Sequence, residues 1–250
     1  MIPSPLLDIR GLCKSFGGLH VTRQVSLQMN AGERVGLIGP NGAGKTTLIN
    51  LITGVLQPNS GNVFLMGRDI TALPQDQRVR LGLARTFQIT QLAPRLPIGL
   101  QVALAIHQRL GSVHHMWSAV SSYLPVRTEA MDILHTLGMA DLADKAPLAL
   151  AYGQQRLVEM AIAMALQPRV LLLDEPMAGV PTAERDVVLK ALDTLPTDLA
   201  ILMIEHDMDL VFSFAQRMVV LAEGEVLAEG APAFIRQHAA VRTAYLGEVG

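Results

Sequence analysis

The sequence predicts an α/β protein with a mainly parallel central sheet. Strand-like and helix-like segments alternate along much of the chain, as they do where helices cover a parallel sheet. The run Val170–Leu173 is apolar without interruption, which is typical of a strand buried on both faces. A glycine-rich loop also stands between an expected strand at Arg34–Ile38 and an expected apolar helix at about Lys45–Val55.

The amino-terminal part is expected to contain short strands joined by turns. Glycine-containing turns separate three strand-like segments before the glycine-rich loop, and a turn at residues 58–61 precedes a fourth. The expected strands are Leu6–Arg10, Val25–Met29, Arg34–Ile38 and Val63–Met66.

Residues 88–150 differ in composition from the rest of the chain. Ala, Leu, Gln and His dominate there, and prolines at positions 94, 97, 125 and 147 punctuate the segment. We therefore expect an inserted helical lobe. A longer helix, about Gln154–Leu166, follows it and ends at Gln167-Pro168.

The last third returns to the alternation of helices and strands. Two short segments, Glu225–Glu229 and Ala233–His238, finish the chain. Before them we expect helices at Ala183–Leu195 and Asp209–Ala215, and strands at Ala200–Ile204 and Arg217–Leu221.

Composition excludes several classes of protein. Of the 250 residues, 50% are apolar and 17% are charged, which excludes intrinsic disorder. The single cysteine, Cys13, excludes a disulfide framework and a cysteine-ligated zinc site. A net charge of −2 argues against a general nucleic-acid binder. No apolar run reaches the roughly 18 residues that span a bilayer, and Asp8 and Arg10 interrupt any signal-peptide core. We therefore expect a cytoplasmic protein.

The glycine-rich loop matches the phosphate-binding pattern G-x-x-x-x-G-K-[ST] and lies between a strand and a helix, as that pattern requires. Glycines let successive backbone N–H groups surround phosphate oxygens, and the helix amino terminus adds a favourable dipole. Lys45 is expected to reach the β- and γ-phosphates of a bound nucleotide, Thr46 to bind Mg²⁺, and Thr47 to donate to the phosphates. The loop consists of Gly39, Pro40, Asn41, Gly42, Ala43, Gly44, Lys45 and Thr46.

A pair of carboxylates, Asp174 and Glu175, ends the buried strand Val170–Leu173. Taken alone, the pair could simply solvate a strand end. Together with the phosphate-binding loop, it predicts the second half of a magnesium nucleotide site, in which Asp174 holds Mg²⁺. Glu175 is then placed to orient or deprotonate the water that attacks the γ-phosphate.

With these motifs, the chain resembles the nucleotide-binding subunits of ABC transporters over essentially its whole length. The resemblance implies that Phe16 stacks on adenine with Val21 as a second contact, although Phe16 alone would read as a core residue. It implies that Gln88 joins the Mg²⁺ and water site to the helical lobe. It also implies that His206, which follows a short apolar strand, senses the γ-phosphate.

Leu150 to Arg156 lie where the family signature, leucine-serine-glycine-glycine-glutamine, belongs. The resemblance implies a head-to-tail pair of subunits in which each signature closes over the ATP held by the other. The signature residues expected to act in this way are Ala151, Tyr152, Gly153 and Gln154.

Two positions depart from the family pattern. Ala151 replaces the serine whose hydroxyl contacts the γ-phosphate, and Pro181 stands where an aspartate is common. The hypothesis is that this chain hydrolyses ATP with its own Glu175 and His206 but contributes a weakened signature to its neighbour.

The resemblance also implies a domain organisation. It predicts one nucleotide-binding domain over residues 1–250, with an amino-terminal antiparallel β subdomain and phosphate-binding core at 5–87 and 155–250. The helical signature lobe is expected at 88–154.

Short motifs are similar to one branch of the family, the ATPase subunits of branched-chain amino-acid importers and their urea- and amide-importing relatives. These motifs are Arg85 to Gln88, the Tyr152 form of the signature, Ala178-Gly179 and Ala244 to Glu248. Such subunits, the same or paralogous, work beneath permeases supplied by a periplasmic binding protein. The resemblance thus implies a peripheral protein at the cytoplasmic face of the inner membrane.

Other functions of a phosphate-binding loop fit the same residues less well. A soluble ABC ATPase acting on nucleic acid or ribosomes would typically carry a coiled coil, a second cassette or a basic arm, and the sequence has none. A small-molecule kinase or GTPase would not need the signature, Gln88 and His206 together. The solute, the direction of transport and the choice between homodimer and heterodimer stay open.

Overall fold

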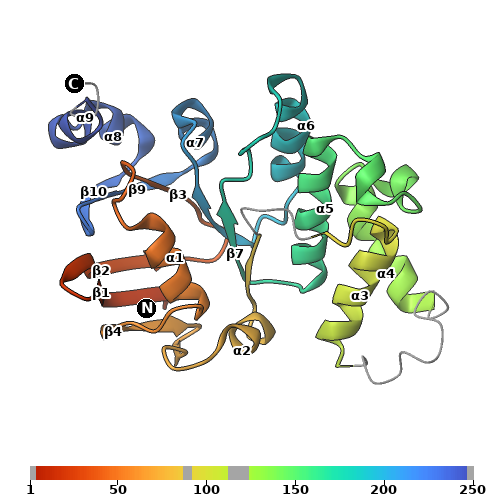
Figure 1. The fold of residues 1–250 in the computed structure, drawn as a ribbon, viewed down its shortest axis with the longest axis horizontal. Helices are drawn as coiled ribbons and strands as arrows, with labels where there is room; N and C mark the ends of the chain where they lie inside the picture. Colours follow the sequence, from red (N-terminus) through yellow and green to blue (C-terminus); the bar gives the residue numbers. More distant parts are fainter. Residues whose placement is uncertain (1–3, 87–91, 112–123, 247–250) are drawn as a thin grey trace. The chain divides into compact units, whose positions relative to one another are not determined.

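In the part of the chain that the structure describes, six strands form the central sheet, and four more form a separate antiparallel sheet near the amino terminus (Figure 1). The computed structural model describes residues 4–86, 92–111 and 124–246. Within these residues the chain divides into two compact units. The first unit holds the chain up to Ala84, Arg169–Glu175 and the chain from Thr197 onward, and the second holds Arg85–Pro168 and Pro176–Pro196.

The central sheet has the strand order β10-β9-β3-β8-β7-β6. Its pairs β3/β8, β3/β9 and β7/β8 are parallel, whereas β9/β10 is antiparallel. This confirms the predicted mixed α/β class with a mainly parallel sheet. The strands are β3 (Arg34–Ile38), β6 (Leu83–Arg85), β7 (Val170–Asp174), β8 (Ala200–Ile204), β9 (Arg217–Ala222) and β10 (Glu225–Gly230).

The amino-terminal sheet has the order β2-β1-β4-β5, and its three strand pairs are antiparallel. Its strands are β1 (Leu7–Phe16), β2 (Leu19–Met29), β4 (Ser60–Leu65) and β5 (Arg68–Asp69). The first two run longer than predicted. Gly11 does not end β1 but sits at a register shift between Ile9 and Leu12, where its φ of 55° is tolerated.

Side chains on the central strands alternate between two buried clusters, because successive strand residues point to opposite faces. Leu37 and Val219 join the cluster that also contains α1 (Lys45–Thr53) and the amino-terminal sheet. Ile38 and Val220 join the opposite cluster, which α7 (Met208–Phe214), α8 (Pro232–Gln237) and α9 (Ala239–Leu246) help to form. Figure 1 shows α1 against the amino-terminal strands, on the other side of the sheet from α7.

The second unit is helical. Helices α3, α4 and α5 pack on one another, and α6 packs on α5. The unit is larger than the segment 88–154, because these contacts also bring α5 and α6 to the lobe; the functional subdivision stays a prediction. Its helices are α3 (Ile98–Arg109), α4 (Leu124–Thr136), η3 (Ala140–Leu142), η4 (Pro147–Ala149), α5 (Tyr152–Ala165) and α6 (Thr182–Asp193).

Several element boundaries differ from those expected. Helix α5 starts at Tyr152 rather than Gln154, and β4 starts within the expected turn at Ser60. Helix α2 (Gln75–Arg80), the short strands β5 and β6, and α9 were not predicted, because each is too short to show a hydrophobic period. None of the described helices is long and apolar enough to cross a bilayer.

Arg78 of α2 fixes the end of α1. Its buried guanidinium donates to the carbonyl oxygens of Leu51 and Ile52 at the carboxyl end of α1, at 2.8 and 2.7 Å. It also donates to the carbonyl oxygens of Leu73 and Thr71, at 2.9 and 2.6 Å. The carbonyl oxygen of Leu51 also accepts the Gly54 N–H at 3.4 Å. Arg78 thus gives that carbonyl a second, shorter hydrogen bond and supplies a donor to Ile52 at the end of the helix. The helix that begins with Lys45 is therefore anchored at its far end.

Candidate nucleotide-binding site

The glycine-rich loop leaves the carboxyl end of β3 and ends where α1 begins at Lys45. Gly44 precedes the helix in a left-handed conformation, with a φ of 98°. A Cβ atom there would lie 2.6 Å from the carbonyl oxygen of Val21. Only glycine tolerates both the positive φ and the close approach to Val21, so this turn explains the second glycine of the motif.

Lys45 is buried, and its ammonium is held within the loop. Its Nζ donates to the carbonyl oxygens of Gly39 and Pro40, at 2.6 and 2.9 Å. These bonds keep the charge beside the backbone amides at the start of α1. A phosphate at that position would meet both a fixed cation and a helix amino terminus.

Glu175 and His206 come together because their strands are adjacent and parallel. Asp174 at the end of β7 pairs in register with Ile204 at the end of β8. The residues that follow these strands therefore emerge at the same edge of the sheet. The Nε2 atom of His206 lies 2.8 Å from Oε1 of Glu175.

The same edge receives the glycine-rich loop, because β3 is the other parallel neighbour of β8. A cavity of about 230 Å³ opens there. Its lining unites most of the predicted phosphate-binding residues with the predicted second adenine contact, the water-activating carboxylate and the γ-phosphate sensor: Val21, Asn41, Gly42, Ala43, Gly44, Lys45, Thr46, Thr47, Glu175 and His206. All of them belong to the first unit.

Asp174 and Thr46 supply the oxygen atoms expected for Mg²⁺. Asp174 is buried at the end of β7, and Thr46 lies in the first turn of α1 with its side chain exposed. A carboxylate and a hydroxyl are hard oxygen donors of the kind that Mg²⁺ prefers, so this donor set fits the ion. The third expected ligand, Gln88, lies outside the described residues.

Phe16 is not a core residue. It is the last residue of β1, the residue is 48% exposed, and the Lys14 ammonium lies 5.5 Å from the ring centroid. An exposed ring is free to stack on a base. Its role in adenine binding stays a prediction.

The signature residues lie in the second unit, at the start of α5. Ala151 is the residue before the helix, and the side chain of Gln154 accepts a hydrogen bond from its backbone N–H at 3.0 Å. The Tyr152 hydroxyl accepts from the Arg156 guanidinium at 3.1 Å, and that guanidinium also donates to the carbonyl oxygen of Ala178. The turn is thus tied to the loop that follows Glu175.

One contact at the signature was not predicted from the sequence. The backbone N–H of Gly153 donates to the carboxylate of Glu184 on α6, at 2.7 Å. Glu184 stands 31 residues away from Gly153, so no spacing rule within one helix would have linked them.

The amino-acid sequence matches the ABC transporter family over residues 22–178. Residues 225–250 match the branched-chain amino acid ATP-binding cassette transporter family. The chain is 39% identical to the high-affinity branched-chain amino acid transport ATP-binding protein LivG of Salmonella typhimurium, over 98% of each chain.

Two further similarities extend this comparison. The chain is 35% identical to the lipopolysaccharide export system ATP-binding protein LptB of Acidithiobacillus ferridurans, over 98% of each chain. The solved ADP conformation of MJ1267, an ATP-binding cassette of an ABC transporter, is 28% identical with a TM-score of 0.85. That match covers 98% of this chain and 100% of MJ1267, so it includes both units.

Proposed function

The chain belongs to the ABC transporter family, and we propose that it is the ATP-hydrolysing subunit of an importer for branched-chain or related hydrophobic amino acids. The cavity that unites Lys45, Glu175 and His206 carries the ATPase part of this proposal. The solute class is supported by the family match at residues 225–250 and by the identity to LivG.

The residues of the cavity account for the steps of hydrolysis. Lys45 and the amides at the start of α1 hold the β- and γ-phosphates. Glu175 accepts a proton from a water molecule as its oxygen bonds to the γ-phosphorus and the bond to the β-phosphate oxygen breaks, which yields ADP and inorganic phosphate. His206, 2.8 Å from Glu175, orients that carboxylate and contacts the γ-phosphate. Mg²⁺, held by Thr46, Asp174 and Gln88, would neutralise phosphate charge.

A second ATPase subunit, the same or paralogous, would complete each site. The described lining of the cavity comes from the first unit alone, whereas the signature residues belong to the second unit. In a head-to-tail pair, the signature turn of one subunit closes over the ATP of the other. ATP binding then favours the closed pair, and loss of the γ-phosphate reopens it.

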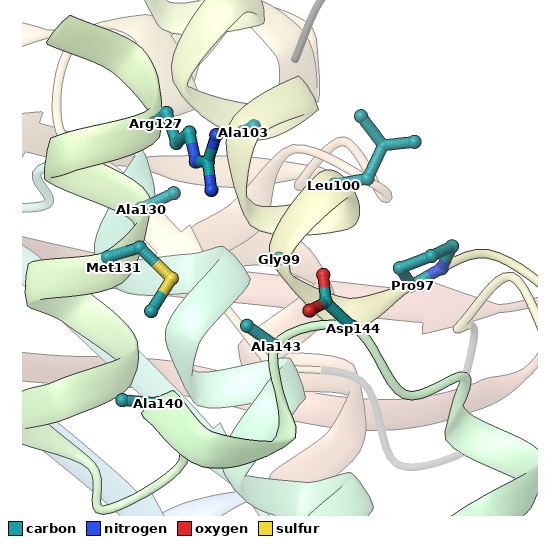
Figure 2. A pocket seen from close by; sticks show the side chains of 10 residues that line it. All are labelled: Pro97, Gly99, Leu100, Ala103, Arg127, Ala130, Met131, Ala140, Ala143 and Asp144. Atoms are coloured by element: carbon teal, nitrogen blue, oxygen red, sulfur yellow. The ribbon is translucent and has the colours of Figure 1, made fainter. Parts of the chain in front are cut away.

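The second unit offers a surface for a membrane subunit. A cavity of about 390 Å³ opens between α3, α4 and the segment after η3. Figure 2 shows that its walls are mostly apolar, with Arg127 and Asp144 directed toward the same space. An apolar recess with a few charges is suited to a short helix of a permease. Such a contact would hold the chain at the cytoplasmic face of the inner membrane.

Reconstitution tests the proposal. The chain is co-expressed with candidate permease subunits, and the purified complex is placed in proteoliposomes with ATP and the periplasmic binding protein. We expect leucine, isoleucine or valine to stimulate ATP hydrolysis and to be transported toward the compartment that contains this subunit.

Each other outcome identifies a different function. Stimulation by urea or short amides alone would assign the chain to that branch, and movement of a solute in the opposite direction would make the system an exporter. Activity stimulated by nucleic acid or ribosomes, without membrane partners, would contradict the transporter proposal.

A further inference from the structure

Helix α5, which carries the signature, begins without a side-chain cap from its own N-cap residue. A serine, threonine or aspartate at the N-cap accepts a hydrogen bond from the backbone N–H two or three residues later. Ala151 occupies this position and has no acceptor atom in its side chain. Only the reverse half of a capping box forms, in which Gln154 accepts from the Ala151 N–H.

Glu184 supplies the missing acceptor from another helix. Its Oε2 accepts the N–H of Gly153, the second residue of α5, at 2.7 Å. This is one of the two amides that an N-cap side chain serves. A carboxylate is well suited to the place, because it carries negative charge at the positive end of a helix.

Pro181 explains why Glu184 is available for this contact. Glu184 is the third residue of α6, and Pro181 is the N-cap residue of that helix. A glutamate at the third position normally folds back to the backbone N–H of its own N-cap residue. Pro181 has no N–H, so the carboxylate of Glu184 has no such partner within α6.

The contact between Gly153 and Glu184 leaves little room for a side chain at position 153. A Cβ atom on Gly153 would lie 3.1 Å from Oε2 of Glu184 and 3.2 Å from its Cβ. Beside it, a Cβ atom on Gly179 would lie 3.1 Å from the Tyr152 ring, so the two loops are in direct contact. Glycine at both positions permits this approach.

We propose that Glu184 is a positioning residue that replaces the absent serine cap and holds the signature turn in shape for the neighbouring subunit. The two departures of this chain, Ala151 and Pro181, are then parts of one arrangement. The first removes a cap from α5, and the second frees a carboxylate to restore it. The catalytic part of this inference rests on the proposed ATPase function.

Amide hydrogen exchange on the full chain tests the cap itself. In E184A we expect the protection of the Gly153 N–H to fall by about fivefold, the effect of losing a typical cap. The double variant E184A with A151S should regain that protection, since serine caps its own helix. D186A, which removes an exposed carboxylate from the same helix, should leave it unchanged. Equal protection in E184A and the parent chain would overturn the proposal.

ATP hydrolysis by the assembled transporter tests the positioning role. We expect E184A to raise the KM for ATP by about fivefold with little change in kcat, and E184Q, whose side chain can still accept, to retain most of the affinity. A151S should restore the KM of E184A to within about twofold. Reduced amide protection with an unchanged KM would refute the positioning role, whereas an inactive parent complex would refute the proposed ATPase function instead.

Discussion

Glu175 adopts a backbone conformation that glutamate rarely takes, with a φ of 50°. Its amide donates to the carbonyl oxygen of Ile204 at 2.9 Å, and its carboxylate contacts His206. A non-glycine residue in this region costs about 1–3 kcal/mol and persists only where its surroundings hold it. The strained turn directs the carboxylate into the cavity rather than along the strand, which is what the attack on a bound phosphate requires.

This geometry gives a prediction for E175Q. Glutamine keeps the size and a hydrogen-bonding oxygen but cannot take the proton of the attacking water, so ATP hydrolysis should fall by about two to four orders of magnitude. ATP affinity should change by less than about threefold, because Lys45 and the helix terminus remain. Steady-state hydrolysis and equilibrium nucleotide binding measure the two quantities. Hydrolysis within tenfold of the parent chain would show that another group activates the water.

Elements with a strong local pattern were predictable, and elements held by distant contacts were not. The ends of β3 and β8 match their predicted bounds because each is a short apolar run with clear flanking turns. Helix α2 has no apolar period, and Arg78 is held there by carbonyl groups of α1. The grouping of Lys45, Glu175 and His206 could be anticipated from motifs. The Gly153–Glu184 contact could not be anticipated, because it joins two helices that are distant in sequence. It also depends on what two residues lack: Ala151 has no capping side chain, and Pro181 has no backbone N–H.

Arg78 is expected to stabilise the fold through α1. Burial lowers its pKa to about 10, so the guanidinium is still charged at neutral pH. In R78M, carbonyl groups at the end of α1 lose their buried donor, which should cost about 2–4 kcal/mol of unfolding free energy. Chemical denaturation measures this loss. The unfolding free energy of R78K should lie between those of the parent chain and R78M, because lysine keeps the charge but lacks the planar guanidinium. R80M, at an exposed position of the same helix, is the control, and its unfolding free energy should differ little from that of the parent chain. Equal losses in R78M and R80M would contradict the proposal that Arg78 anchors α1.

Charged side chains at the strand ends make stability depend on pH. Arg217 at the start of β9 donates to Glu33 at 2.6 Å and to Glu229 of β10. Burial alone would raise the pKa of Glu33, but the hydrogen bond and charge of Arg217 and the Asn30 amide outweigh it and lower that pKa below 4.5. The ionised carboxylate thus stabilises the fold above about pH 4.5, and this contribution is lost as the pH falls through the lowered pKa.

For E33Q we therefore expect a lower denaturation midpoint than that of the parent chain at pH 7. The difference should narrow as the pH falls below about 4.5, because the parent carboxyl is then also neutral. E225Q, which alters an exposed carboxylate of β10, is the control and should not reproduce this pH dependence. A difference that stays constant from pH 7 to pH 3 would contradict the assignment to Glu33.

At the scale of the whole molecule, the two halves of the expected catalytic machinery reside in different units. The first unit presents the phosphate-binding cavity, and the second presents the signature turn at the start of α5. This division is what a head-to-tail pair requires. It also allows the signature to be altered without touching the residues that bind ATP in the same chain.

Substitutions at position 151 distinguish two roles of its side chain, capping of α5 and contact with the γ-phosphate of a second subunit. Serine and aspartate both cap a helix well, so A151S and A151D should each stabilise the start of α5. Only serine is compatible with a γ-phosphate brought by a second subunit, since aspartate would place like charge against it. In the E175Q background with ATP, we expect the parent chain to dimerise, A151S to dimerise at a several-fold lower concentration, and A151D to stay monomeric. Sedimentation with and without ATP measures this, and dimerisation of A151D equal to that of A151S would exclude a signature that faces the phosphate of its partner.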